Sequence, residues 1–173
     1  TSGKVDGAAF PYPELRSYEV AAGIKFRYFF DPILKDIPDD AFIASPATIQ
    51  AKGDALRRFC RAIVEASILI RVNPQLAAKY FVEESGMKVT DEAIVTEARL
   101  LSISQDLLPA HDPTNMQIGK MPVRGLQVLT KFMYDNGLTP QLVPATDLVT
   151  DQFIGYANDF DHRALMARAR AMR

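Results

Sequence analysis

Apolar and polar residues follow two different patterns along this chain, and the pattern changes near residue 45. Before that point, short segments either alternate with period two or are wholly apolar, which is typical of β-strands. A helix over residues 13–20 begins at Pro13 and stops at Gly23. We predict three strands in this part of the chain, over residues 5–10, 24–29 and 41–45.

In the rest of the chain, apolar residues recur every three or four positions, as on one face of an α-helix. A long helix is predicted from an N-cap at Asp54 to Val72. Asn73 and Pro74 end it and begin a second helix, which runs to Gly86. Further helices are predicted over residues 91–107, 122–137 and 151–157, and from a cap at Asp159 or Asp161 to the C-terminus.

The order of these elements predicts an α/β fold, with few strands near the N-terminus followed by mostly helices. Three short strands leave sheet edges that need neighbours, because an unpaired edge exposes backbone N–H and C=O groups. The helices must therefore cover these edges, or other strands must pair with them.

Composition and charge limit the kinds of partner that the protein is expected to bind, but they do not indicate a catalysed reaction. The 20 basic and 21 acidic residues give a net charge of −1, which does not favour binding to nucleic acid. The single cysteine, Cys60, excludes an intramolecular disulfide, and its place on an apolar helical stripe indicates a small buried hydrophobe. His111 and His162 lack metal-ligand spacing and are expected to be solvated or helix-capping, so no metal or other cofactor is predicted.

Four segments carry a resemblance to a known family. Residues 3–9 (GKVDGAA) and 42–45 (FIAS) resemble two of its strands. Residues 55–78 resemble its long helix, Asn-Pro break and following helix, and residues 132–138 with 148–154 resemble its closing segment. In this order, the segments resemble the C-terminal half of periplasmic solute-binding proteins of ABC importers, in the nitrate, sulfonate and thiamine-precursor group.

The resemblance implies the C-terminal half of a type II periplasmic-binding fold, with residues 1–40 as the strand–helix–strand tail of the second lobe. Residues 41–48 then form the crossover or hinge strand, and residues 49–173 form the helical C-terminal part of the first lobe. Because members of this family are longer, we expect a fragment of a periplasmic or other extracytoplasmic protein. Such a fragment would pair with its missing N-terminal half or self-associate, as a dimer or a domain swap.

The function implied by the resemblance is capture of a small organic or oxyanionic solute by cleft closure, and its delivery to an ABC permease. Sulfonates, nitrate, pyrimidines and aromatic acids are the expected solute types. The resemblance places Phe10, Tyr12 and Glu14 near the cleft, where aromatic rings would cover an apolar part of the ligand. Backbone N–H groups at the start of the Pro13 helix would receive an anionic group. Ser45 is a candidate hinge or ligand contact.

Other interpretations of these residues and of the chain stay open. Aromatic residues beside a strand end are also typical of a packed core, and a serine before proline is typical of a turn. An enzyme of thiamine-pyrimidine synthesis has a similar fold but also a cysteine-rich motif, whereas this chain has Cys60 alone, so no enzyme is predicted. A self-contained helical protein-interaction module would instead be a compact soluble monomer.

Overall fold

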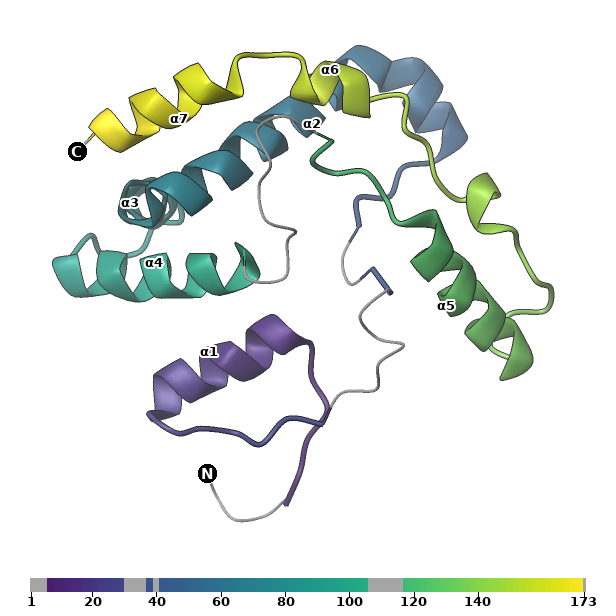
Figure 1. Cartoon of the computed structure of the whole chain (residues 1–173), viewed down its shortest axis with the longest axis horizontal. Helices are drawn as coiled ribbons and strands as arrows, with labels where there is room; N and C mark the ends of the chain where they lie inside the picture. The colour runs from purple at the N-terminus through teal and green to yellow at the C-terminus, as the bar shows by residue number, and fades with distance from the viewer. Residues whose placement is uncertain (1–5, 30–36, 39–40, 106–116, 173) are drawn as a thin grey trace. The chain divides into compact units, whose positions relative to one another are not determined.

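The computed structural model describes residues 6–29, 37–38, 41–105 and 117–172, and all of its regular elements are helices (Figure 1). They are α1 (Tyr12–Ala22), α2 (Pro46–Val72), α3 (Pro74–Glu84), α4 (Asp91–Gln105), α5 (Val123–Asp135), the 3-10 turn η2 (Ala145–Asp147), α6 (Ile154–Asn158) and α7 (His162–Ala171).

The chain divides into two compact units. The first contains α1, the part of α2 from Glu65 onward, α3, α4 and α7. In this unit α4 packs against both α3 and α1. The second contains the part of α2 up to Val64, together with α5, η2 and α6, and α5 packs against η2.

The described residues contain no β-strand, so the predicted α/β fold with N-terminal strands is wrong. Ile24 and Phe26 show part of the reason, because their backbone N–H groups donate to α1. The Ile24 N–H donates to the Glu19 carbonyl at 3.3 Å, and the Phe26 N–H donates to the Glu19 carboxylate at 2.7 Å. An alternating pattern predicts a segment with one apolar side, but it cannot supply the partner that a strand needs.

The other two predicted strands are also absent from the described residues. Val5 lies outside these residues, and the remainder of the 5–10 segment has no regular structure. Residues 41–45 form an irregular approach to α2, in which the side chains of Phe42 and Ile43 are 71% and 95% exposed. Without a neighbouring strand, an apolar run of this length gains neither ladder hydrogen bonds nor burial.

Helix α2 begins earlier than the sequence predicts. Pro46 is its first residue and does not end a strand, and the Ser45 hydroxyl accepts the Thr48 N–H at 3.1 Å. Lys52 has φ −125° and ψ 24°, which interrupts the helical geometry near the predicted cap at Asp54. Residues 46–72 therefore comprise two helical segments that meet at a kink, and the second segment starts next to the predicted cap at Asp54.

The predicted break between α2 and α3 is confirmed. The Asn73 side-chain oxygen accepts the Leu76 N–H at 3.1 Å, and Pro74 occupies the first position of α3. The Asn73 side-chain nitrogen donates to the carbonyls of Ala169 at 2.9 Å and Met172 at 3.1 Å. The same side chain therefore caps α3 and holds the end of α7.

Three predicted glycine stops and one predicted cap agree with the structure, whereas the helix predicted over residues 151–157 begins only at Ile154. Gly23 follows α1 with φ 64°, Gly86 follows α3 with φ 75°, and Gly137 follows α5 with φ 69°. These left-handed conformations favour glycine because it has no Cβ. Of the two caps predicted for the last helix, Asp161 is the one used, since its carboxylate accepts the Ala164 N–H at 2.9 Å.

The two units differ in how much apolar side chain they bury. The first unit buries several large residues in α2, α3 and α4, together with smaller ones: Ile68, Leu76, Ala77, Ala78, Val82, Ala98, Ile103 and Ala169. Among the described residues of the second unit, the buried apolar side chains are Val64, Ala145 and Ala157. Because stabilisation scales with the apolar area removed from water, the second unit has the weaker core.

Candidate functional site

Three of the four predicted ligand residues lie at the start of α1 in the first unit. Phe10 precedes the helix and packs edge-on against Tyr18, with ring centroids 5.4 Å apart. Tyr12 is the first residue of α1 and is half-buried, while Glu14 is exposed in the first turn. Phe10 therefore packs against an aromatic residue of the same chain. This contact fits the alternative interpretation, in which Phe10 is a packing residue.

The start of α1 is a poor site for an anion. Pro13 has no N–H, and the Leu15 N–H already donates to the Pro11 carbonyl at 3.2 Å. The exposed Glu14 carboxylate adds a negative charge to the same turn. That charge stabilises the helix through its dipole, but it repels a bound anion. The predicted use of this helix start to receive an anionic group therefore has little support in the geometry.

Ser45, the fourth predicted residue, belongs to the second unit and is exposed. Its hydroxyl oxygen accepts the Thr48 N–H and lies 3.0 Å from the Thr48 hydroxyl. These contacts make Ser45 a helix cap, which accounts for a serine immediately before Pro46. Its predicted role as a hinge or ligand contact stays a prediction.

Among the described residues, Cys60 and His162 are the side chains whose surroundings bear most directly on reactivity. Burial raises the pKa of the Cys60 thiol above its ordinary value, with a smaller opposing effect from a backbone hydrogen bond, so the reactive thiolate is disfavoured. His162 is buried and stacks on Phe160, with ring centroids 4.0 Å apart, so it is neither solvated nor the cap of α7. His111 lies outside the described residues. In the described ranges, no three His, Cys, Asp or Glu residues are grouped to hold a metal ion.

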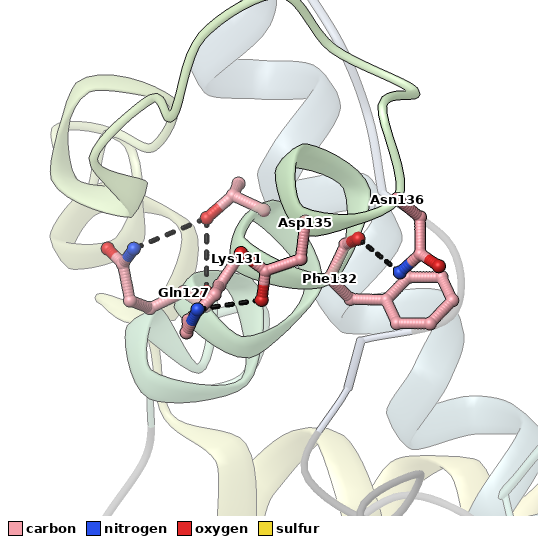
Figure 2. A network of polar contacts seen from close by, with 6 residues as sticks. Gln127, Lys131, Phe132, Asp135 and Asn136 are labelled. Carbon is pink, nitrogen blue, oxygen red and sulfur yellow. Dashed lines mark hydrogen bonds and ion pairs between the residues drawn. The ribbon is translucent and has the colours of Figure 1, made fainter.

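Polar residues near the end of α5 form a network with a structural role (Figure 2). Lys131 pairs with Asp135 at 2.7 Å, and the Asn136 amide donates to a backbone carbonyl one turn earlier at 2.8 Å. Gln127 accepts the Ala145 N–H at 2.9 Å. These bonds close the end of α5 and attach η2 to it, which explains why polar residues gather here.

Arg61 also has a structural role, which the sequence did not indicate. Its guanidinium donates to the Tyr156 carbonyl, from Nε at 3.2 Å and from Nη2 at 2.7 Å, and also to the Asp159 carbonyl. The same group lies over the Tyr156 ring, 4.4 Å from its centroid. Arg61 therefore joins α2 to the end of α6 within the second unit, a contact between residues too far apart in sequence for a local pattern to indicate.

The first unit contains a hollow that sequence reasoning also missed. Its volume is about 500 Å³, and α1, α3 and α4 supply its walls: Arg16, Val20, Pro74, Gln75, Val95, Ala98, Arg99, Ser102 and Ile103. The α4 residues share one helical face, which is a signal that the sequence carries. That Arg16 of α1 lines the same hollow as these α4 residues depends on the tertiary structure.

Within the described residues, no helix is both long and apolar enough to cross a bilayer. Comparisons of the chain with protein families, with curated proteins and with solved structures found no match.

Proposed function

We propose that this chain is part of the solute-binding component of an ABC importer, which binds a small organic or oxyanionic solute and passes it to a permease. The observation that carries the proposal is the ordered resemblance of four sequence segments, residues 3–9, 42–45, 55–78 and 132–138 with 148–154. Two of these segments, residues 3–9 and 42–45, resemble strands of the family, whereas the described residues contain no strand, so the proposal rests on the order of the segments and not on a sheet.

The helical part of the resemblance has support in the structure. The long helix α2, the break at Asn73 and Pro74, and the helix α3 follow one another as the resembling segment requires. The Asn73 cap explains why these two residue types stand together at that point. This support concerns local structure, and it leaves the solute and the permease as proposals.

Exposed apolar side chains support the proposal that this chain acts within a larger assembly. In the second unit, Phe132 is 56% exposed and Leu138 is 64% exposed, in addition to the exposed Phe42 and Ile43. Large exposed apolar surfaces typically mark places that another protein covers. The proposed cover is the remainder of the binding protein or a second copy of this chain.

A thermal-shift screen of the complete encoded protein tests the importer proposal. Sulfonates, nitrate, pyrimidines and aromatic acids form the panel, because these are the solute types that the resemblance implies. A ligand at a concentration of 100 Kd stabilises the native state by about 2.7 kcal/mol and so raises Tm. We expect at least one class to raise Tm in a saturable manner, and a panel without any such response would contradict the proposal.

The second candidate function is a helical protein-interaction module. The observation that favours it is that every regular element in the described part of the chain is helical. This candidate predicts a compact monomer, whereas a part of a larger binding protein is expected to self-associate through its exposed apolar side chains. Sedimentation velocity over a concentration series separates the two outcomes.

A charged substitution makes the sedimentation test specific. If association buries Ile43, then Ile43→Lys should weaken it, because a charge would be taken out of water. Gln141→Lys is the control, since it adds the same charge at an exposed polar position of the second unit. A monomer at all concentrations would favour the module. Equal association of both variants and the unmodified chain would show that Ile43 is not in the contact.

A further inference from the structure

The hollow in the first unit has the volume of a small-molecule site and is open to solvent. Its volume of about 500 Å³ is within the range of roughly 300–1,000 Å³ that is usual for ligand pockets. Val20 of α1 and Val95 and Ile103 of α4 supply apolar walls, and Pro74 supplies another from the start of α3. This lining suits an apolar ring or chain.

Two guanidinium groups distinguish the hollow from a simple apolar groove. Arg16 of α1 and Arg99 of α4 both line it. Arg16 is paired with Glu19, whose side chain is only 4% exposed and also accepts the Phe26 N–H. Glu19 therefore positions Arg16 and balances its charge.

Arg99 supplies the uncompensated charge of the hollow. No carboxylate in the described part of the chain forms an ion pair with it, and its side chain is exposed. With Arg16 balanced by Glu19, the net charge of the lining is close to one positive unit. A guanidinium presents several N–H donors in one plane, which matches the oxygens of a carboxylate or sulfonate.

The other polar groups of the lining are consistent with a single anionic group. The Ser102 hydroxyl donates to the Ala98 carbonyl at 2.7 Å, so its proton is already committed within α4. Gln75 contributes an amide, which can donate. Donors for an oxyanion therefore come from the two arginines and Gln75, and the remaining contacts are apolar.

From this arrangement we infer that the hollow binds a small aromatic monoanion, of the aryl sulfonate or aryl carboxylate class. The anionic group lies against Arg99 and Arg16, and the ring lies against Val20, Val95 and Ile103. The site is inferred from the geometry of the first unit, whereas the choice of ligand class rests in part on the importer proposal, which implies sulfonates and aromatic acids. Binding of benzenesulfonate that the Arg99 and Val95 variants leave unchanged would overturn the site without touching the importer proposal. Its residues also differ from the four that the sequence resemblance suggested.

Titration of the ¹⁵N-labelled chain with benzenesulfonate tests the inference. We expect saturable changes of amide chemical shift confined to the residues of α1, α3 and α4 that line the hollow. Benzenesulfonamide has a similar size but no charge, and inorganic sulfate has charge but no ring. Each should bind about tenfold more weakly or worse, because one of the two contacts is lost.

Three variants assign the binding to this hollow. Arg99→Gln should weaken benzenesulfonate binding about tenfold by removing a charge-assisted contact. Arg170→Gln removes an exposed arginine of α7 in the same unit and should leave the affinity unchanged. Val95→Glu, at an exposed position one turn before Arg99, adds a repelling carboxylate and should weaken binding without disturbing a buried residue.

The same titrations can overturn the inference. Absence of saturable shifts would do so, as would shifts spread equally over the exposed apolar residues of both units. Unchanged affinity in both Arg99→Gln and Val95→Glu would also do so. The amide spectrum of each variant shows directly whether it remains folded, so loss of binding through unfolding is recognised.

Discussion

Asn73 connects α2, α3 and α7 through one side chain. We predict that Asn73→Ala lowers the free energy of unfolding by about 2 kcal/mol, since it removes both the α3 cap and the bonds to α7. Urea denaturation followed by circular dichroism measures this change. Asn73→Ser retains a cap acceptor but loses the amide donor to α7, so its loss should be smaller. Equal losses in both variants would show that the cap contributes little.

Cys60 gives a prediction about reactivity at the residue scale. Because burial raises its pKa, the thiolate is less populated at a given pH than in an ordinary thiol. Alkylation by iodoacetamide at about pH 8.5, where a free thiol is half ionised, should be slower in the folded chain than in urea. The measurement is loss of free thiol with time. Equal rates in the two states would contradict the raised pKa.

The same shift has a consequence for stability. A thiol whose folded pKa is raised binds its proton more tightly in the native state than in the unfolded state. Its contribution to stability is therefore present below the ordinary thiol pKa, and it is lost as the pH rises through the folded pKa. This places the sensitive pH range on the alkaline side of neutrality.

Helix ends are the clearest feature at the scale of elements. Gly137 has φ 69°, its N–H donates to the Tyr134 carbonyl at 3.0 Å, and the Leu138 N–H donates to the Met133 carbonyl at 2.8 Å. Such a pair of bonds satisfies carbonyls that the helix itself leaves open. The end of α5 therefore depends on a backbone conformation that L side chains rarely adopt.

Substitution of Gly137 tests that dependence. We predict that Gly137→Ala lowers the free energy of unfolding by about 1 kcal/mol, because the added Cβ is strained at positive φ. Gly155→Ala is the matched control, since Gly155 lies in α6 without a positive φ and an added Cβ would meet open space. That control should leave stability unchanged or slightly raised. Denaturant titration compares the two, and equal effects would contradict the argument.

At the scale of the whole molecule, the two units bury different amounts of apolar side chain. Ile68 and Val82, the largest fully buried side chains in the described residues, both belong to the first unit. Local unfolding is easier where fewer apolar contacts must be broken. The second unit should therefore open more often than the first.

Hydrogen exchange measures this difference. We predict that amides of α3, which carries Ala78 and Val82 at its buried positions, exchange more slowly than amides of α5. Exchange in D₂O followed by mass spectrometry or by amide spectra resolves the two helices. Slower exchange in α5 would show that burial of the described side chains does not determine local stability in this chain. Covering the second unit with a binding partner should reduce the difference.

Several of the places where helices begin and end in this protein can be predicted from the amino-acid sequence alone. The break at Asn73 and Pro74, the caps and the glycine stops were predictable because their hydrogen-bond partners lie within a few residues. The helix start near Asp54 was predictable for the same local reason, since a second helical segment begins just after the kink at Lys52.

The remaining features depend on contacts between residues that are distant in sequence. A strand requires a neighbouring strand, and an alternating pattern does not indicate which segment that is. In this chain the Phe26 N–H donates to the Glu19 carboxylate of α1. The hollow likewise requires Arg16 and Arg99, residues far apart in sequence, to face the same space. Local hydrogen bonding fixes where a helix begins and ends, whereas pairing and packing depend on which distant residues the folded chain brings together.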